Sequence, residues 1–224
     1  MPVERHVRVQ RTARFYQLGT PSAATRELWV ACHGYGQLAA PFAAALEPIN
    51  DGTRVIVAPE ALSRFYLDDP AKQHGPESPI GASWMTRADR EVEIADYVEY
   101  LDIVTATLRG QLEGRDIPVV ALGFSQGVAT VCRWAALGRA VIRRLIVWGG
   151  TIPHDLPRDR GEQLFRGASV TLVAGKTDRL VPLDALERGQ RALAELGVRA
   201  DLVTHDGGHS LSSATLRAIA SRAQ

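Results

Sequence analysis

The stretch Ile117-Pro-Val-Val-Ala-Leu-Gly-Phe-Ser-Gln-Gly127 decides the fold class of this chain. Its first six residues form a short, continuous apolar run, which is typical of a strand buried on both faces. The run leads into Gly123-Phe124-Ser125-Gln126-Gly127, and a helical pattern then extends from Gln126 to Leu137 and stops at Gly138. A buried strand, a tight turn and a helix in direct succession predict one unit of a parallel sheet covered by helices.

The same alternation of apolar runs and amphipathic segments continues along the chain. It predicts a first strand or hairpin at 6–16, strands at 28–33, 54–58, 145–148, 170–174 and 198–205, and helices at 42–46, 87–112, 183–196 and 210–220. This order predicts an α/β fold with a mostly parallel central sheet and helices on both faces. With 224 residues, the chain is long enough for one sizeable domain and short for two.

One long connection interrupts this pattern, between residues 59 and 86. It contains scattered aromatic residues and a series of turn formers, namely Pro70, Gly75, Pro76, Pro79 and Gly81. Connections of this length in a compact domain are usually functional or disordered. Most of the predicted strands end in Gly or Pro turns at their carboxyl ends, where open α/β sheets bind ligands. We therefore expect residues 59–86 to form an ordered active-site wall at that edge.

The composition excludes several classes of protein. Hydrophobic residues make up 46% and charged residues 23%, so the chain as a whole is not disordered. The 26 basic and 25 acidic residues leave a net charge of +1, which provides no strong field for nucleic acid or an anionic membrane. We expect Cys32 and Cys132 to be buried free thiols, because each lies in an apolar run. No apolar stretch approaches membrane-spanning length, and the opening residues lack the apolar core of a signal peptide, so we expect a cytoplasmic location without membrane insertion.

The turn at Ser125 has the pattern Gly-x-Ser-x-Gly between a strand and a helix, which is the arrangement called a nucleophile elbow. A tight turn of this kind lifts the serine hydroxyl clear of the sheet edge. The amino end of the following helix offers unpaired N–H groups and a positive dipole end to a developing negative oxygen. The alternative is a plain turn in which Ser125 only caps the helix.

A serine nucleophile needs a base, and the base needs an acid that orients it. In this class of fold the chain order is serine, acid, histidine. Asp178 comes just after the strand at 170–174 and is the predicted acid, with Asp184 as its nearest rival. His209 precedes the last predicted helix and is the predicted base, while His205 at the strand end is its rival.

Two backbone N–H groups are expected to bind the oxyanion that forms during acyl transfer. The first is the N–H of Gln126, which follows the serine. The second is assigned to Tyr35, in the turn His33-Gly34-Tyr35-Gly36 that follows an early strand. His33 stands too early in the chain to be the base, so a structural role is expected for it.

The walls of a substrate pocket are harder to predict. Candidates for substrate contact are the side chains of Tyr66, Trp84 and Met85, together with the ring of Tyr35, all in or beside loops at the same sheet edge. For each of them, packing in the core or within a loop is an equally good interpretation.

Four segments together resemble the phospholipase/carboxylesterase family of α/β-hydrolases, a group that includes acyl-protein thioesterases and small bacterial carboxylesterases. They are His33–Gly36, Gly123–Gly127, Gly175–Pro182 and Gly208–Ser210, and the resemblance runs from about residue 28 to residue 221. It implies a single α/β-hydrolase domain over residues 1–224, without a large cap domain. It also implies a triad of Ser125, Asp178 and His209, with oxyanion donors at Tyr35 and Gln126. Family members more often carry Leu and Asp at the positions of Tyr35 and Gln37.

The expected function is therefore that of a serine hydrolase acting on small-molecule carboxylic esters, or on thioesters, with small or medium acyl groups. The sequence implies neither a metal nor an organic cofactor, and it predicts no nucleic-acid partner. Two alternatives stay open. The triad could serve a peptidase or a lactonase, or the chain could be a binding protein that keeps the fold without the activity. The sequence leaves the oligomeric state open.

Overall fold

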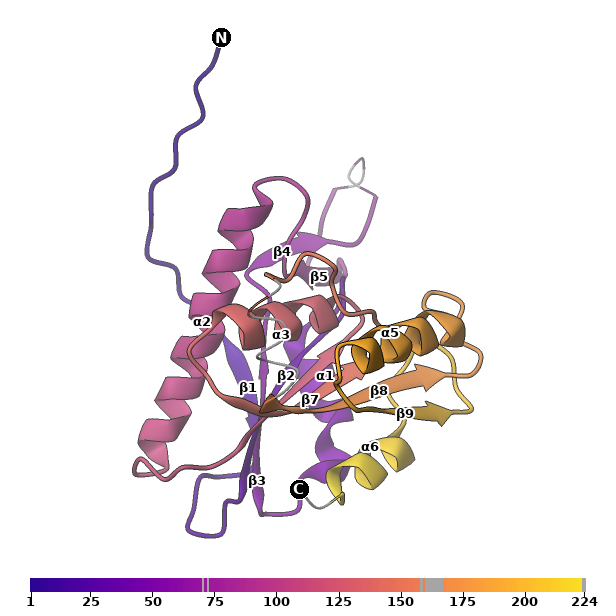
Figure 1. Cartoon of the computed structure of the whole chain (residues 1–224). Coiled ribbons are helices and arrows are strands. Elements are labelled where there is room, and N and C mark those ends of the chain that lie inside the picture. Colours follow the sequence, from indigo (N-terminus) through magenta and orange to yellow (C-terminus); the bar gives the residue numbers. More distant parts are fainter. Residues whose placement is uncertain (70, 72, 158, 160–166, 223–224) are drawn as a thin grey trace.

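The computed structural model describes residues 1–69, 71, 73–157, 159 and 167–222 of the chain, and its centre is a seven-stranded sheet (Figure 1). The strand order is β1-β3-β2-β6-β7-β8-β9. The strands are β1 (Phe15–Leu18), β2 (Glu27–Cys32), β3 (Arg54–Pro59), β6 (Val119–Phe124), β7 (Ile142–Trp148), β8 (Ser169–Gly175) and β9 (Ala200–His205). Only β1 pairs in the antiparallel sense, with β3, so the prediction of a mostly parallel sheet is confirmed.

Helices cover both faces of the sheet, as the sequence predicts. Alternate residues of β2 show the division: Leu28 and Val30 belong to the core under one set of helices, and Trp29 and Ala31 belong to the core under the other. The first set is α2 (Arg90–Gln111), α3 (Gln126–Leu137) and α5 (Leu183–Glu195), and the second is α1 (Ala39–Ala45), the short helix η1 (Glu47–Ile49) and α6 (Ser213–Ala220) (Figure 1). The predicted bounds of α3 are confirmed to the residue.

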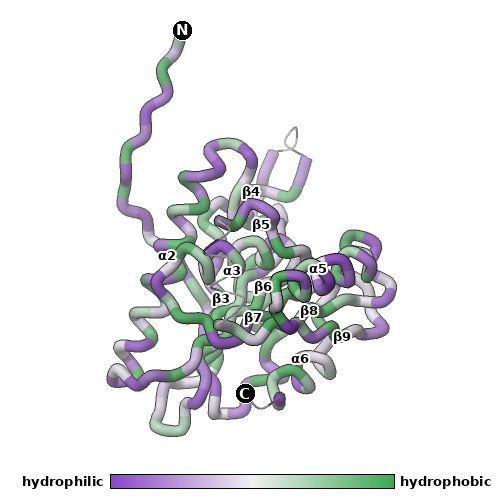
Figure 2. Tube along the Cα trace, viewed as in Figure 1, coloured by the Kyte–Doolittle hydropathy of each residue, from purple (hydrophilic) through white to green (hydrophobic). Residues whose placement is uncertain are grey.

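Hydrophobic residues gather along the central strands (Figure 2). Every residue of β6 is buried, as expected for a strand with helices on both sides. Cys32 and Cys132 are free and buried, and burial raises the pKa of both thiols, that of Cys132 to about 12. These thiols are therefore unreactive at neutral pH. None of the helices in the described part of the chain combines the length and the apolarity needed to cross a membrane.

The long connection between β3 and α2 is partly regular. Strands β4 (Ser63–Tyr66) and β5 (Ile80–Ser83) pair as an antiparallel two-stranded sheet within it. A single bridge between Gln37 and Ala82 joins this hairpin to the turn after β2. The described part of this connection therefore forms a hairpin and not a cap domain. Its second strand, β5, is joined to the turn after β2, which the sequence predicts to carry an oxyanion donor.

The predicted first strand at 6–16 is wrong in its position. The strand begins only at Phe15, and residues 1–10 are exposed and without regular structure, running out from the body (Figure 1). Val7 and Val9 alternate with polar residues as strand residues do, but they are 84% and 79% exposed. Alternation produces a stable strand only where a neighbouring strand and a buried face receive it, and this segment has neither.

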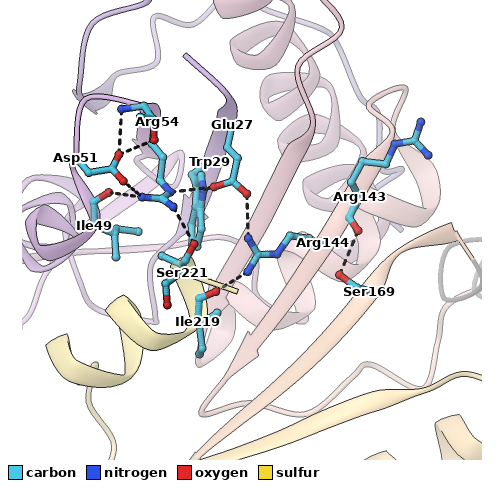
Figure 3. Close-up of polar contacts among 12 residues, drawn as sticks. Glu27, Trp29, Ile49, Asp51, Arg54, Arg143, Arg144, Ser169, Ile219 and Ser221 are labelled. Atoms are coloured by element: carbon cyan, nitrogen blue, oxygen red, sulfur yellow. Dashed lines mark hydrogen bonds and ion pairs between the residues drawn. The ribbon is translucent and has the colours of Figure 1, made fainter. Parts of the chain in front are cut away.

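A network of ion pairs joins the amino ends of three strands to the last helix (Figure 3). Glu27 in β2 accepts hydrogen bonds from Arg54 in β3 (2.9 Å), from Arg144 in β7 (2.9 Å) and from the indole of Trp29 (3.0 Å). The same two guanidinium groups donate to the carbonyl oxygens of Ala220 and Ile219, at the carboxyl end of α6. Positive charge is favourable at that end of a helix, so the network fixes α6 against the sheet.

We predict that Glu27→Ala lowers the free energy of unfolding by about 3 kcal/mol, because it leaves two largely buried arginines without their shared carboxylate. Urea unfolding followed by circular dichroism measures this. The control is Arg188→Ala, which removes an exposed ion pair with Asp184 and should shift the midpoint much less. Equal shifts for the two variants would contradict a structural role for the network.

Candidate active site

Ser125 lies in a strained turn between β6 and α3. Its φ is 54° and its ψ is −117°, a region that residues with side chains rarely adopt. The backbone N–H of Ser125 donates to the carbonyl of Trp148 in β7 at 2.9 Å, which helps to hold the turn. A Cβ atom on Gly127 would come within 2.1 Å of the carbonyl oxygen of Cys32, so only glycine lets α3 start this close to β2.

Asp178 and His209 form a hydrogen-bonded pair. The distance between His209 Nδ1 and Asp178 Oδ2 is 2.7 Å. The other carboxylate oxygen, Oδ1, accepts the backbone N–H groups of Leu180 (2.8 Å) and Val181 (2.9 Å). Burial alone would raise the pKa of Asp178, but these N–H groups and His209 outweigh it and lower the pKa. The carboxylate is therefore ionised and accepts a hydrogen bond from His209 Nδ1. The other ring nitrogen, Nε2, has no hydrogen-bond partner among the described residues.

His209 lies beside the serine turn. Its ring is 4.9 Å from the ring of Phe124, the residue before Ser125, and a Cβ on Gly149 would be 3.4 Å from its edge. Within the described part of the chain, Ser125 Oγ and the ring of His209 are not joined by a hydrogen bond. The structure thus brings the predicted acid and base together and places the base next to the predicted nucleophile, without a closed hydrogen bond between base and nucleophile.

The two rivals lie elsewhere. Asp184 is exposed on α5 and pairs with Arg188 one turn further along the helix. His205 is 8% exposed, its Nδ1 accepts the N–H of Gly207 at 3.1 Å, and its ring packs on Trp148. Burial lowers the pKa of His205, so this imidazole is neutral at physiological pH. Neither residue contributes to the Asp178–His209 pair.

His33 has the structural surroundings that the sequence suggested. Its ring is fully buried, with Nδ1 donating to the carbonyl of Gly34 at 2.8 Å and Nε2 accepting the N–H of Ala61 at 3.1 Å. Burial lowers the pKa of His33. A neutral imidazole is also what this pair of bonds requires, since one nitrogen donates and the other accepts. His33 thereby ties the turn after β2 to the segment that follows β3.

Two backbone N–H donors beside Ser125 have no partner among the described residues, one at the start of α3 and one in the turn after β2. Gly34 N–H is occupied by the side-chain oxygen of Gln37 at 2.7 Å. By contrast, no hydrogen bond within the described residues uses the N–H of Tyr35 or of Gln126. Gly34 abuts the serine, since a Cβ there would lie 3.1 Å from Ser125 Cβ. The free N–H groups therefore belong to the residue after Ser125 and to a turn packed directly against it.

The side chain of Gln126 has a role that sequence reasoning missed. Its Nε2 donates to the carbonyl of Met85 (3.0 Å) and to Ser83 Oγ (3.1 Å), while its Oε1 accepts the N–H of Trp84 (3.1 Å). One amide thus attaches the end of β5 to the first turn of α3. The sequence contains no signal for this contact, because it joins residues about 40 positions apart.

The structure places the residues predicted to contact substrate in different surroundings. Trp84 is only 3% exposed, donates its indole N–H to the carbonyl of His33 at 2.8 Å and packs edge-on against Tyr97. Of the two interpretations that the sequence allowed for Trp84, these contacts agree with packing in the core. Its ring lies between the turn after β2 and α2. Met85 is partly buried, and its sulfur accepts from Arg133 at 3.4 Å.

The two tyrosines are exposed. Tyr35 is 61% exposed, with its ring 5.3 Å from that of Phe65, and Tyr66 is 46% exposed and stacks on His74 at 4.0 Å. Both rings therefore pack against the β4–β5 hairpin or its connection. Substrate contact by Tyr66, Met85 or the Tyr35 ring stays a prediction.

A cavity of about 480 Å³ opens beside His209 on the α1 side of the sheet. Three predicted parts of the site contribute to its lining: the turn after β2, the serine turn and the loop that carries His209. The lining residues are Gly36, Gln37, Leu38, Pro41, Phe42, Ala45, Ile80, Phe124, His209, Ser210 and Leu211. The contributions from α1 and from Ile80 were not predicted, because periodicity assigns α1 only a face toward the core.

The loop after β7 is fastened to two helices through Asp155. This carboxylate accepts from Arg133 of α3 at 3.0 Å and also pairs with Arg90 of α2. Burial by itself would raise the pKa of Asp155, but the two guanidinium groups lower it to about 2. Arg133 also contacts Met85, so the same group touches the wall at the end of β5.

We predict that Asp155 contributes pH-dependent stability. Because its pKa is about 2 in the folded chain and its ordinary value is 3.8, the contribution is present above about pH 4 and is lost as the pH falls toward 2. The free energy of unfolding should be higher for the parent than for Asp155→Asn near neutral pH, and the difference should shrink between pH 4 and pH 2. Denaturant titrations at a series of pH values measure it, and a difference that does not vary with pH would contradict the assignment.

No family model matches the sequence, and a comparison with curated proteins also finds no match. Solved structures are similar over nearly their whole length. Esterase PE8 has a TM-score of 0.65 and 23% identity, with 94% of this chain and 97% of that chain covered. A phospholipase/carboxylesterase from Dyadobacter fermentans has a TM-score of 0.63 and 17% identity (96% and 98% covered). Acyl-protein thioesterase 2 from Zea mays has a TM-score of 0.66 and 17% identity (93% and 96% covered).

These identities are low, so the likeness concerns the fold. A mostly parallel sheet with helices on both faces and a Gly-x-Ser-x-Gly turn between a strand and a helix is typical of the α/β-hydrolase fold. The chain has the α/β-hydrolase fold that these esterase and thioesterase structures share.

Proposed function

We propose that this chain is a serine hydrolase of the phospholipase/carboxylesterase family and that it cleaves carboxylic esters of small or medium acyl groups. The observation that carries the proposal is the buried, ionised Asp178 bonded to His209 beside the strained turn at Ser125. The similar structures include an esterase, a phospholipase/carboxylesterase and an acyl-protein thioesterase, which supports the same class of reaction.

In the proposed first step, His209 Nε2 takes the proton of Ser125 Oγ while that oxygen attacks the ester carbonyl. Asp178 holds Nδ1 and stabilises the imidazolium that forms. A small movement has to close the bond between Nε2 and Oγ, and catalytic hydrogen bonds of this kind often tighten only when substrate is bound. The free N–H groups of Tyr35 and Gln126 are the proposed donors to the carbonyl oxygen as it becomes negative.

His209 then gives this proton to the leaving alcohol oxygen as its bond to the carbonyl carbon breaks, and an acyl group remains on Ser125. In the second step, water attacks the acyl carbon while His209 Nε2 removes one of its protons. The bond between the acyl carbon and Ser125 Oγ breaks, His209 returns the proton to Oγ, and the carboxylic acid leaves. No step in this sequence requires a metal or an organic cofactor.

Two features favour an active enzyme over a binding protein with the same fold. A positive φ at Ser125 is costly, and strain of this kind is retained where it serves a site. In addition, the N–H groups of Tyr35 and Gln126 have no partner within the described structure, which leaves both free to bind an oxyanion. Thioesters, lactones and peptides remain alternative substrates for the same residues. A cytoplasmic location remains a prediction from the sequence.

We predict that Ser125→Ala lowers kcat for p-nitrophenyl acetate by about 10⁶-fold, because a triad acts as a unit. A fluorophosphonate should label the parent at Ser125 and should not label this variant. Ser221→Ala is the matched control, since Ser221 is exposed near the end of α6 and lies outside the site. Hydrolysis by Ser125→Ala at a near-parental rate would contradict the mechanism, and a folded parent that resists labelling would favour the binding protein.

The choice among substrates needs a second measurement. p-Nitrophenyl esters of increasing acyl length, run beside an acyl-CoA, a lactone and a peptide, compare kcat/KM across the classes. The proposal expects the highest value for one of the oxygen esters. A peptide or a lactone as the best substrate would replace the esterase by one of its alternatives, with the same nucleophile.

We also predict that Gly34→Ala lowers kcat for ester hydrolysis by about 10²-fold, the scale of losing one oxyanion donor. The added methyl group would lie 3.1 Å from Ser125 Cβ and 3.2 Å from Phe124, so it should push the Tyr35 N–H away from the serine. Gly110→Ala is the control, because a Cβ there meets no atom within 4 Å. Unchanged kcat in Gly34→Ala, in a folded protein, would remove Tyr35 from the proposed oxyanion site.

A further inference from the structure

The cavity of about 480 Å³ beside His209 is lined by a few polar residues and mostly by apolar ones. Of its lining, His209 and Ser210 lie in the loop before α6, and Gly36 and Gln37 lie in the turn after β2. The apolar lining includes the side chains of Leu38, Pro41, Phe42, Ala45, Ile80 and Leu211. None of the described residues that line the cavity is an aspartate, glutamate, lysine or arginine.

We infer that this cavity binds the alcohol portion of the ester, and that the physiological substrates are esters of uncharged, apolar alcohols. The inference rests on the proposed function, because it assigns one side of the cleaved bond to one side of the same site. It specifies the alcohol half of the substrate, whereas the family resemblance concerns the acyl half.

The position of the base decides which half of the ester enters. When the tetrahedral intermediate collapses, the bond between the carbonyl carbon and the alcohol oxygen breaks, and that oxygen takes the proton that His209 Nε2 received from Ser125. The leaving oxygen must therefore lie within hydrogen-bonding distance of His209. Asp178 occupies Nδ1, so the leaving oxygen meets the opposite side of the ring. A group attached to that oxygen continues into the space that His209 itself lines.

The absence of charged side chains from the described lining supports an uncharged ligand. The side-chain oxygen of Gln37 is already used by Gly34 N–H, so this acceptor belongs to the turn and is not available to a ligand. An alcohol with a charged group would have to lose water beside Phe42, Leu38 and Leu211 without a partner of opposite charge, which is unfavourable. An apolar alcohol instead gains from leaving water.

The volume sets a rough upper size. An apolar cavity of about 150 Å³ is large enough to bind benzene. The present cavity has about three times that volume, and His209 forms part of its lining. A benzyl or a medium-chain alkyl group therefore fits.

Ala45 provides a direct test. It lies in the last turn of α1, lines the cavity and is exposed at the surface, so a larger side chain there can fill the space without entering the core. Its neighbour Ala44 is equally exposed and does not line the cavity. Ala45→Trp is therefore the test variant, and Ala44→Trp is the control with the same added ring on the same helix.

Two series of uncharged esters separate the two halves of the substrate. The first varies the alcohol at constant acid: methyl, butyl and benzyl acetate. The second varies the acid at constant alcohol: methyl acetate, methyl butanoate and methyl phenylacetate. We expect Ala45→Trp to lower kcat/KM for benzyl acetate by about tenfold or more, the scale of a filled apolar pocket, and to leave methyl acetate and the acid series within about twofold. Ala44→Trp should leave both series unchanged.

The other outcomes are informative in different ways. A parent that hydrolyses no member of either series contradicts the proposed function itself. A parent that is active, combined with an Ala45→Trp effect on the acid series, shows that the cavity holds the acyl group and overturns the inference. The inference is also overturned if Ala45→Trp changes neither series, or lowers methyl acetate hydrolysis as strongly as that of benzyl acetate.

Discussion

The strained backbone at Ser125 is the constraint on which the rest of the site depends. A positive φ at this residue turns the chain sharply from β6 into α3, and it is maintained by contacts on two sides. The N–H of Ser125 is bonded to β7, and Gly127 lies against the end of β2 with no room for a side chain. Because both neighbouring strands hold the turn, it cannot relax without separating the central strands. The serine is therefore held in place by the buried central strands of the sheet.

Neutral amides and an uncharged imidazole organise the turn after β2 and the wall beside the serine. Gln37 occupies Gly34 N–H, His33 fixes the carbonyl of the same residue, and Gln126 fastens the wall at Met85. These bonds satisfy backbone groups that would be costly to bury alone. These bonding groups are uncharged, so they add no negative charge beside the proposed oxyanion donors. The free N–H groups therefore keep their attraction for a negative oxygen. The charged clusters of Asp155 and Glu27 lie in the supporting structure, where they join helices and loops to the sheet.

Local patterns predicted most of the elements, and the errors have physical causes. The run Val119–Phe124 and the helix after it are recognisable because burial on both faces demands an unbroken apolar strand. The first strand was misplaced because Val7 and Val9 alternate correctly but find no partner strand. The sequence left Trp84 open between core packing and substrate contact, because an aromatic residue in a Pro- and Gly-rich connection gives no periodicity to decide between them. Its burial depends on contacts with His33 and Tyr97, which no local pattern encodes.

By itself, the sequence determined the fold class, the position of the serine turn and the chain order of serine, acid and histidine. These features are local or follow from periodicity, since a strand, a turn and a helix are each specified by neighbouring residues. Only the tertiary structure decided that His209 rather than His205 meets Asp178, that the amide of Gln126 holds the wall, and that α1 closes a cavity beside the base. Each of these is a contact between segments far apart in the chain, and such contacts exist only after the sheet has brought the segments to one edge.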